Sequence, residues 1–506
     1  MVNCKMMKRY LLLWWSVCSA IVLQAQDHGI QWVQGDAPIS IMDFRDDTIA
    51  RRFITNDAEM FIGTANICDE VGNFLFFTNG IYVRDRNGNM MPNGDSLGHD
   101  PILHAAFNNV YQSVYQAGAP NMQGVMILPA PEDKSAYYIF HYMPIDTSFL
   151  SKGVAYGLPT RLYYSIVNMN ENFGLGAVTV KNEVLYNGLL CASRMTAVKH
   201  GNGRDWWIIR HGFLDNTYYK FLLTPDGLEG PFVQNIGPVF GLEGRAFDYY
   251  GTSVFNQTGD KMATANQLGP LVLLDFDRCS GEFSNPEVIK NIVQDTLYGA
   301  MGLAFSPNGR FLYVSNKISL NQYDLWNDNL NDSVRLFTET DDNGYAIKTV
   351  QLAPNGKVYI ATWHGGLYAL HVVNNPDELG LACNFEFAGQ PSITANTVNL
   401  PNMVNYKLSA AVGSGCDTVV SSLGELGIDR FNVSVSPNPA SDFVRIEASK
   451  NGRFELYNAV GQMVLNYNWK RNDNLPVSVS QLPSGIYNYQ FVTGDGEVSK
   501  GKLVKE

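Results

Sequence analysis

Short apolar and aromatic runs, separated by tight polar turns, recur along most of the chain. Residues 303–316 (LAFSPNGRFLYVSN) show the pattern most clearly. Alternation of aromatic or aliphatic with other positions on both sides of the turn is typical of half-buried β-strands. The turn, 306–309 (SPNG), has proline to fix φ and glycine to accept a positive φ. The stretch therefore predicts a strand, a tight turn and a second strand.

The same unit returns at intervals. Residues 350–362 are a close copy, and 253–264 are a looser one. Earlier turns precede strand-like runs at 73–78, 135–141 and 204–210, so that six turns end at Gly72, Lys134, Gly203, Gly259, Gly309 and Gly356. The later spacings, 50 and 47 residues, match the roughly 40–50 residues of one four-stranded propeller blade. The earlier spacings of 62, 69 and 56 residues leave room for longer loops.

A third strand follows in several units, at 271–276, 320–325 and 367–372. This order predicts a β-propeller, because stacked sheets bury each other's faces in a ring. We expect about seven blades. Six are visible, and a seventh is expected to combine residues 396–408 with 29–44 and so to join the ends of the ring. The core expected between blades includes Phe305, Phe311, Tyr313, Leu352, Val358 and Ile360.

The pattern changes after residue 407. Residues 413–424 are small and polar and are typical of a linker. Residues 431–506 contain seven short strand-like runs with Gly and Pro turns, which predict a small β-sandwich. The expected fold is all-β, with a propeller over 26–410, a linker over 411–430 and the β-sandwich over 431–506.

The first 25 residues have the pattern of a secretory signal peptide. Lys8 and Arg9 precede an apolar run at 10–23, which is too short to span a membrane comfortably. The predicted cleavage lies between Ala25 and Gln26. A membrane anchor at the N-terminus is the alternative interpretation of this run.

The net charge of the chain argues against two classes of partner. The mature chain has 33 Lys and Arg against 48 Asp and Glu, a net charge of −15. Nucleic acids and anionic lipids are bound through clustered Lys and Arg, so we expect neither as a partner.

Five cysteines remain after cleavage, an odd number, and no two form a CxxC pair. An oxidising compartment permits one or two disulfides. The pairing among Cys68, Cys191, Cys279, Cys383 and Cys416 is left open by the sequence.

No catalytic or zinc-binding spacing is present in the eight histidines or around the serines. Aromatic side chains are the remaining candidates for binding. Trp207 lies on a predicted strand, where core packing is the alternative, and Trp363 and His364 lie at a predicted turn. Residues 341–344 (DDNG) resemble the start of a calcium loop but are also typical of a plain turn, so calcium is a possible cofactor and no other is indicated.

The C-terminal region resembles the type A sorting domain of the type IX (Por) secretion system of Bacteroidetes. The resemblance rests on 436–441 (SPNPAS), 454–464, 482–487 (LPSGIY) and a last strand with lysines at 500–505. The matching positions are Pro437, Asn438, Pro439, Gly461, Leu482, Gly485 and Tyr487. The resemblance implies recognition by the type IX machinery and passage across the outer membrane. It also implies removal of the domain, with release of the cargo or its attachment to surface lipopolysaccharide.

Residues 60–405 also resemble exported propeller proteins of Bacteroidetes, through segments such as 72–80, 91–94, 123–129 and 382–385. This resemblance implies a fold and a destination but no chemistry. Three functions stay open: a surface-delivered module that binds protein or glycan, a hydrolase of glycan or peptide with carboxylates at the central channel, and a structural component of the envelope. Carboxylates or histidines converging in the channel would favour the hydrolase, whereas an apolar and aromatic wall would favour binding.

Overall fold

The structure is a computed structural model. It describes most of the chain after residue 25, in the ranges 26–36, 38–46, 48–54, 59–60, 63–98, 118–119, 122–142, 160–240, 251–266, 270–289, 300–316, 318–338, 346–363, 369–391, 400–416, 433–448, 450–458, 462–470, 476–493 and 498–506. The chain divides into two compact units, Met1–Val419 and Val420–Glu506. The predicted signal peptide, with Ala25 at its end, lies outside the described residues.

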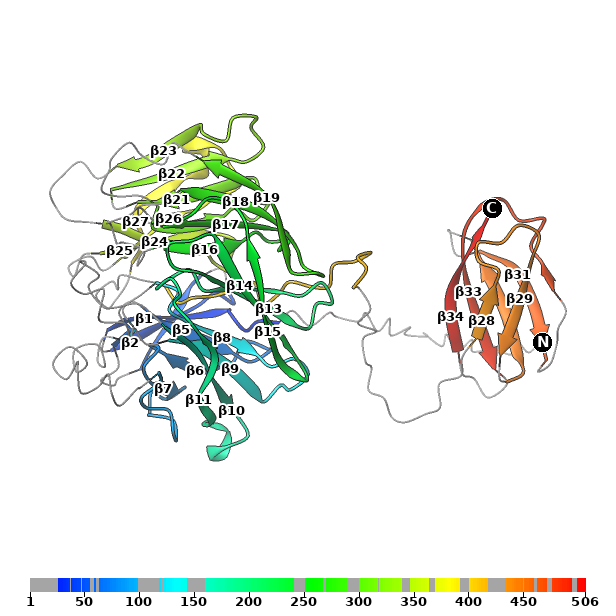
Figure 1. Cartoon of the computed structure of the whole chain (residues 1–506), viewed down its shortest axis with the longest axis horizontal. Coiled ribbons are helices and arrows are strands. Elements are labelled where there is room, and N and C mark those ends of the chain that lie inside the picture. Colours follow the sequence, from blue (N-terminus) through cyan, green and yellow to red (C-terminus); the bar gives the residue numbers. More distant parts are fainter. Residues whose placement is uncertain are drawn as a thin grey trace, which may run out of the picture. The chain divides into compact units, whose positions relative to one another are not determined.

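Antiparallel sheets make up the first unit, and seven of them are present in its described part (Figure 1). The first sheet has the strand order β3-β2-β1-β4, from β1 (Gln31–Asp36), β2 (Ile39–Asp43), β3 (Ala50–Ile54) and β4 (Glu59–Met60). The second has three strands, β5 (Ala65–Cys68), β6 (Phe74–Thr78) and β7 (Val83–Asp85). The third has the order β11-β10-β9-β8, from β8 (Val125–Pro129), β9 (Ala136–His141), β10 (Arg161–Asn168) and β11 (Ala177–Asn187).

The remaining four sheets each pair four consecutive strands in order. The fourth contains β12 (Thr196–Lys199), β13 (Trp206–His211), β14 (Thr217–Thr224) and β15 (Gly227–Asn235). The fifth contains β16 (Gly251–Phe255), β17 (Lys261–Asn266), β18 (Leu271–Asp277) and β19 (Glu282–Ile289). The sixth contains β20 (Gly302–Phe305), β21 (Phe311–Ser315), β22 (Ser319–Asp324) and β23 (Ser333–Thr338). The seventh contains β24 (Ala346–Leu352), β25 (Val358–Trp363), β26 (Ala369–Val373) and β27 (Phe385–Pro391).

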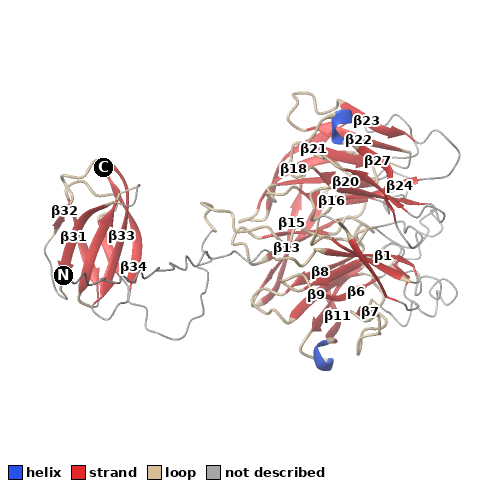
Figure 2. Ribbon diagram, turned by 180° about the vertical axis from the view of Figure 1, so that it is seen from behind, coloured by secondary structure: helices blue, strands red, loops and turns tan. Residues whose placement is uncertain are grey.

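The polar turns of the repeat connect the first and second strands of the sheets, as the sequence predicts. Gly259, Gly309 and Gly356 have φ values of 73°, 74° and 77°, in the region that favours glycine. The turn at 131–134 lacks glycine, and there Glu132 adopts a φ of 67°. Helical structure in the described residues is limited to short 3-10 turns, among them η2 (Asn172–Gly174) and η3 (Gly380–Cys383) (Figure 2).

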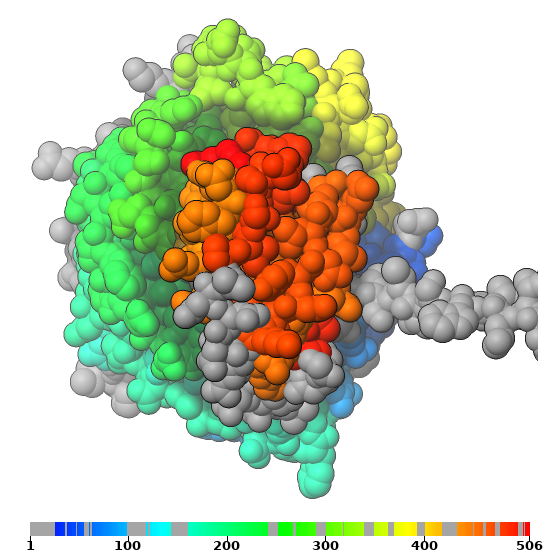
Figure 3. Space-filling model, turned by 90° about the vertical axis from the view of Figure 1, so that its right-hand side faces the viewer, coloured from blue at the N-terminus to red at the C-terminus, as the bar shows by residue number. Residues whose placement is uncertain are grey.

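The sheets form a closed ring. The first strands of neighbouring sheets lie side by side, β12 next to β16, β16 next to β20 and β20 next to β24. The ring closes where Trp32 of β1 meets Tyr359 of β25, with ring centroids 6.1 Å apart and the planes at 78°. Figure 3 shows this closure as a circle of colours in which the yellow of the last sheet returns to the blue of the first. The predicted β-propeller is confirmed.

Apolar side chains from facing sheets fill the spaces between them. One cluster joins the sixth and seventh sheets and contains Phe311, Tyr313, Val358 and Ile360, all fully buried. Phe305 belongs to the cluster between the fifth and sixth sheets, and Leu352 is partly buried against the first of these clusters. Burial of such a side chain contributes about 1.5–3 kcal/mol, so the contacts between sheets are a main source of stability.

The expected seam of the ring is wrong in one respect. Residues 29–44 do enter the first sheet, but its four strands all come from 31–60. Residues 400–408 are not a strand; they cross several sheets at the centre of the ring. Pro401 has no N–H to donate to a strand neighbour, which is consistent with this outcome. Residues 396–399 lie outside the part of the chain that the structure describes.

Two sheets form the second unit around one core. β28 (Val433–Ser436), β29 (Phe443–Ala448) and β32 (Val477–Ser478) make a three-stranded sheet. The other has the order β31-β30-β33-β34, from β30 (Gly452–Tyr457), β31 (Met463–Trp469), β33 (Gly485–Thr493) and β34 (Val498–Lys505). Val444, Phe454, Trp469, Phe491 and Leu503 are buried between them.

Candidate functional site

A cavity of about 600 Å³ lies where the first strands of four successive sheets converge. Residues of β12, β16, β20 and β24 form its wall, together with Trp32 of β1. Asn256, Pro307 and Pro354, from the turns that follow three of these strands, also line it. The cavity therefore lies at the centre of the ring, on the side of the repeated polar turns.

The wall combines apolar groups with neutral polar groups. Its apolar side chains include Phe255, Phe305, Leu352 and Met403, and its polar ones are amides and hydroxyls such as Gln26, Gln123, Gln257, Gln351, Thr252 and Thr349. Among the described residues that line the cavity, none is Asp, Glu or His. Lys407 supplies a positive charge, but its Nζ lies 2.7 Å from a carboxylate oxygen of Asp27. The side chains of the described wall thus carry no charge apart from that of the paired Lys407.

Three polar atoms of residues that line the cavity are buried and have no hydrogen-bond partner within the described residues. They are the indole nitrogen of Trp32, the hydroxyl of Thr252 and the amide nitrogen of Gln351. Thr349 Oγ1, also in the wall, accepts the Leu400 N–H at 3.1 Å. A buried polar group without a partner costs about 1–3 kcal/mol, so these three atoms lower the stability of the centre of the ring.

One side of the cavity is formed by residues 400–416, which we call the exit segment. Asn402 holds this segment to three sheets. Its backbone N–H donates to Thr64 O at 2.8 Å, and its side-chain Nδ2 donates to Val125 O and Met195 O at 3.1 Å each. The Tyr406 hydroxyl donates to Ile127 O at 2.8 Å, and burial raises the pKa of this phenol well above its usual range. The segment therefore ties the inner strands together while forming the cavity wall.

Arg278 anchors the segment further along. Its guanidinium donates to the backbone carbonyls of Lys199 (2.8 Å), Thr258 (3.3 Å), His200 (3.2 Å) and Ser409 (2.5 Å). These carbonyls belong to the fourth sheet, the fifth sheet and the exit segment. Because a fork of five N–H donors suits several carbonyls at once, one side chain joins all three elements.

A disulfide completes the attachment. Cys279 follows Arg278 in the turn before β19 and is bonded to Cys416, with the two Cα atoms 5.6 Å apart. Cys68, Cys191 and Cys383 are free and buried, and burial raises the pKa of Cys68 to about 12. The first residues of the predicted linker are therefore fastened to the propeller.

Trp207, a predicted binding residue, is buried. Its side chain is 4% exposed and packs between the fourth and fifth sheets. Its Nε1 donates to Arg278 O at 2.9 Å. The indole is therefore part of the core between these two sheets, which is the alternative that the sequence left open for Trp207.

The structure describes only part of the other residues that the sequence predicts to bind a ligand or calcium. Trp363 is the last residue of β25 and pairs with Ala346 of β24, but its side chain lies outside what the structure describes. His364 and the calcium-like residues 341–344 lie outside the described residues altogether. Within the described ranges, no group of three or more His, Cys, Asp or Glu side chains is arranged to hold a metal ion.

Gln26, the predicted first residue of the mature chain, reaches a buried lysine. The Nζ of Lys199 donates to Gln26 Oε1 and lies 5.2 Å from the ring centre of Trp206. Burial, with a smaller contribution from Arg278, lowers the pKa of Lys199 to about 8. This contact holds Gln26 beside the cavity that it lines.

Buried histidines in the sheets are held neutral. Burial lowers the pKa of His141 to about 3, and its Nε2 lies 2.9 Å from Ser165 Oγ. Burial also lowers the pKa of His371 to about 4, and His371 accepts a hydrogen bond from Ala388 N at 2.9 Å. Neither lines the cavity, and a proton acceptor with so low a pKa is unsuited to general-base catalysis near neutral pH.

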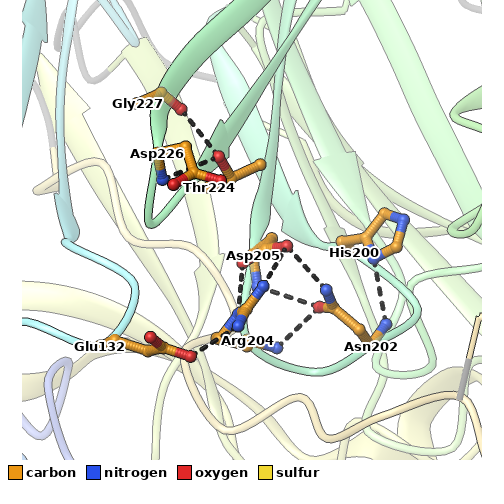
Figure 4. A network of polar contacts seen from close by, with 8 residues as sticks. All are labelled: Glu132, His200, Asn202, Arg204, Asp205, Thr224, Asp226 and Gly227. Carbon is orange, nitrogen blue, oxygen red and sulfur yellow. Dashed lines mark hydrogen bonds and ion pairs between the residues drawn. The ribbon is translucent and has the colours of Figure 1, made fainter. Parts of the chain in front are cut away.

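A polar network joins the third and fourth sheets on the turn side (Figure 4). Arg204 donates to Glu132 at 2.6 Å and to Asp205 at 2.7 Å. Asp205 accepts from Asn202 Nδ2 at 2.7 Å, and the Asn202 N–H donates to His200 Nδ1 at 3.1 Å. The groups satisfy one another across the boundary between two blades, so the network positions turns and does not offer a free acid or base.

In the second unit, the Pro-Asn-Pro sequence docks on the last strand. Asn438 Nδ2 donates to Lys502 O, and Asn438 Oδ1 accepts from Val504 N–H, both at 2.8 Å. The peptide bonds preceding Pro437 and Pro439 are both cis. The side-chain amide of Asn438 thus pairs with the backbone of β34 as a strand would.

Three other sorting-signal positions, Leu482, Gly485 and Tyr487, lie in the described part of the unit. Gly485 begins β33 opposite Lys505, and the Tyr487 hydroxyl donates to Pro483 O at 2.7 Å. Leu482 is packed against the core, and Gly461 lies outside the described residues.

One of the comparisons with known proteins assigns the second unit to a family. A family model described as "Secretion system C-terminal sorting domain" matches residues 434–506. No curated protein sequence matches the chain. Among solved structures, a putative 6-phosphogluconolactonase from Bacteroides fragilis is similar with a TM-score of 0.41 and 11% identity, over 74% of this chain and 98% of that one.

Two further structures are similar at the same level. The β-propeller domain of Cps50 (Swd1) from Myceliophteria thermophila has a TM-score of 0.39 and 9% identity, over 66% of this chain and 91% of that one. A periplasmic gluconolactonase from Pseudomonas aeruginosa has a TM-score of 0.38 and 12% identity, over 73% and 98%. At these identities the names of the neighbours carry no activity to this chain.

The chain is an all-β protein with a propeller body and a C-terminal secretion domain. Residues 434–506 are a sorting domain of the type IX secretion system, which indicates secretion or attachment at the cell surface by way of the outer membrane. A helix able to cross a membrane is not found in the described ranges.

Proposed function

We propose that the propeller is a non-catalytic module that binds protein or glycan outside the cell, and that the central cavity is its recognition site. The observation that carries this proposal is the composition of the cavity wall, which holds apolar, amide and hydroxyl groups and no carboxylate or imidazole among its described residues. A glycosidase needs a pair of carboxylates flanking the bond to be broken. The wall therefore supports binding over hydrolysis.

The construction of the site supports the same proposal. A recognition surface gains affinity when its groups are held in place before the ligand arrives. Asn402, Arg278 and the Cys279–Cys416 disulfide hold the exit segment against the inner strands. The cavity volume of about 600 Å³ is also within the range of small-molecule sites, which suits the end of a chain or a single exposed group.

Export determines where the propeller acts. We propose that the sorting domain engages the type IX machinery and is then removed, and that the propeller is released or attached to surface lipopolysaccharide. The predicted signal peptide, residues 1–25, provides the first step, entry into the periplasm.

A binding screen of the mature chain, residues 26–506, tests the proposal. Immobilised protein is exposed to a glycan array and to outer-membrane and medium proteins, with and without calcium. Saturable binding without turnover is the expected result. Release of shortened glycan or peptide products would favour the hydrolase, and a stable envelope partner found by cross-linking, with no ligand binding, would favour a structural role.

A further inference from the structure

We propose that the mature chain closes its own N-terminus: Gln26 cyclises to pyroglutamate within the folded propeller, and Lys199 promotes the reaction. This inference goes beyond the proposed function and does not depend on it. It rests on the predicted cleavage between Ala25 and Gln26, on the contact between Gln26 and Lys199, and on the attachment of the residue that follows.

Cleavage before Gln26 creates a free α-amino group on a residue whose own side chain ends in an amide. The neutral amine attacks Cδ of that amide and forms a lactam ring. The new bond joins the α-nitrogen to Cδ, and the bond between Cδ and Nε2 breaks. Nε2 takes up the proton that the α-nitrogen loses and leaves as ammonia. The reaction therefore needs no oxidant, reductant or second molecule.

Lys199 contacts the oxygen on which negative charge develops in this reaction. Lys199 is buried, and its Nζ donates a hydrogen bond to Gln26 Oε1. Attack on Cδ moves the electrons of the C=O bond onto Oε1, and a cationic donor already in place stabilises this charge without rearrangement. In enzymes, the loss of one donor of this kind slows the reaction by about 100- to 1,000-fold.

Lys199 must keep its proton for this role. Burial, with a smaller contribution from Arg278, lowers the pKa of Lys199 to about 8, and Glu70 acts in the opposite direction. Burial also lowers the pKa of His28, which lies near Lys199, so this imidazole stays neutral. Lys199 is therefore mostly protonated at neutral pH. A free α-amino group titrates near pH 8, so part of it is neutral and able to attack under the same conditions.

The backbone after Gln26 is held in place. The Asp27 N–H donates to Glu70 O at 3.1 Å, and a carboxylate oxygen of Asp27 lies 2.7 Å from Lys407 Nζ. Because the following residue is fixed and the amide oxygen is held by Lys199, few rotations separate the amine of Gln26 from its own Cδ. Such confinement of two reacting groups raises the rate of an intramolecular reaction. Gln26 lines the central cavity, so ammonia can leave into it.

The product also suits its surroundings better than the free N-terminus does. Cyclisation replaces an α-ammonium beside the cation of Lys199 by a neutral lactam. The lactam keeps the carbonyl oxygen that Lys199 binds. Among the described residues, the cavity wall then carries no charge apart from that of the paired Lys407.

The rate of cyclisation in the purified protein tests the proposal. The mature chain, residues 26–506, is released from a fusion partner by a protease that leaves Gln26 as the first residue. Mass spectrometry of the N-terminal peptide then follows the loss of one ammonia molecule with time. A synthetic peptide of residues 26–35 gives the rate without the fold. We expect the folded chain to cyclise faster than the peptide by about tenfold or more. Its rate should also fall above about pH 8, where Lys199 loses its proton.

Two variants assign the effect to Lys199. Lys199→Met removes the donor and its charge and keeps an unbranched side chain in the buried position. It is expected to slow cyclisation to the rate of the peptide and to abolish the fall in rate above about pH 8. Lys261→Met is the matched control, since Lys261 of β17 is paired with Asp275, and its rate should equal that of the natural chain. Near-ultraviolet circular dichroism confirms that each variant is folded, and the pH profile of the natural chain tests the role of Lys199 without any substitution.

Equal rates in the folded chain and the peptide overturn the inference, as does a folded Lys199→Met variant that cyclises as fast as the natural chain. The protein exported by a strain with the type IX machinery gives a further check. Its N-terminal peptide should begin at residue 26 and be lighter by one ammonia molecule. A free glutamine at this end, or a different first residue, also overturns the inference. These results do not bear on ligand binding by the cavity, so the proposed function is tested separately.

Discussion

Single side chains at the centre of the ring do more than fill space. Asn402 links a segment near the end of the propeller to the inner strands of the second, third and fourth sheets, through Thr64, Val125 and Met195. All these groups are buried. A side-chain amide that satisfies two backbone carbonyls from different blades is a structural requirement at this position, because water cannot replace it there.

Asn402→Ala is therefore expected to lower the free energy of unfolding by about 2–4 kcal/mol, since it leaves two buried carbonyls without a donor. Urea denaturation of the mature chain measures the change. Asn405→Ala is the control: Asn405 also belongs to the exit segment, but its amide bonds the exposed Gln257 at 3.2 Å. A change of less than about 1 kcal/mol is expected for the control. Equal effects of the two variants would contradict this role of Asn402.

Buried histidines make stability depend on pH. In the folded protein, burial lowers the pKa of His141 to about 3 and that of His371 to about 4. In the unfolded chain both titrate near 6.5. Below that pH the unfolded state takes up protons that the folded state refuses, so stability falls as the pH falls from about 6.5 towards 4, by about 1.4 kcal/mol per pH unit for each histidine.

His141→Gln is expected to reduce this dependence. Between pH 7.5 and 5.5, the loss of unfolding free energy should be about 1.4 kcal/mol smaller in the variant than in the natural chain. The comparison uses the difference between two pH values in each protein, so a general loss of stability in the variant does not affect it. An unchanged pH dependence would show that folding does not lower the pKa of His141.

At the level of elements, the exit segment replaces the shared blade that the sequence leads one to expect. Its attachment does not depend on strand pairing. Arg278 and the Cys279–Cys416 disulfide fasten it to the turns of the fourth and fifth sheets. The disulfide joins residues 137 positions apart. In the chain-entropy account, closing a loop of that length raises the free energy of unfolding by up to about 5 kcal/mol.

Cys416→Ser is expected to lower the free energy of unfolding by about 2–5 kcal/mol, because it opens this loop. Thermal and urea unfolding of the mature chain measure the loss, and the natural chain treated with a reductant provides the control. The reduced natural chain and the variant should behave alike. A variant as stable as the oxidised natural chain would show that the disulfide does not hold the segment.

The sequence allowed the regular elements to be predicted with good accuracy and the exit segment to be predicted poorly. The strands predicted on either side of the turn at 306–309 are observed as β20 and β21. Turn glycines and alternating apolar residues are local signals, so the blades could be found from them. The exit segment is specified by distant carbonyls at Thr64, Val125 and Met195, for which a single sequence has no local signal. Pro401 is a local feature that argues against a strand there, because proline has no N–H to donate to a neighbouring strand.

The residues of the cavity wall also have no local signal in the sequence. Tryptophan and histidine drew attention as binding residues, whereas Thr252 and Gln351 are ordinary strand residues in the sequence. Their position in one wall depends on the closure of the ring, which brings β16 and β24 around a common centre. For Trp207 the sequence left binding and core packing open, because only the packing of the neighbouring sheet shows that its indole is covered.

At the scale of the whole molecule, the two units have different roles. The propeller holds the cavity, and the sorting domain provides the export signal. In the sorting domain, Asn438 pairs with the backbone of Lys502 and Val504 and so holds the last strand in place. A signal read at the extreme C-terminus requires that this strand be presented in one conformation.

Asn438→Ala is expected to reduce export several-fold, because both hydrogen bonds to β34 are lost. The measurement is the ratio of extracellular to periplasmic protein in immunoblots of a strain with the type IX machinery. Deletion of residues 433–506 gives the reference for complete retention. Asn488→Ala, at an exposed position of β33, is the matched control and should be exported normally. Normal export of the Asn438 variant would contradict the role of this contact.

The proposal that the central cavity is a recognition site depends on the exit segment being a fixed part of the ring. Hydrogen exchange of the mature chain, followed by mass spectrometry of the peptide covering residues 400–411, tests this directly. The N–H groups of Asn402 and Ala411 donate to Thr64 O and Gly201 O, so we predict exchange as slow as in the inner strands, and faster exchange after Cys416→Ser. Rapid exchange of this peptide in the natural, oxidised chain would contradict the account.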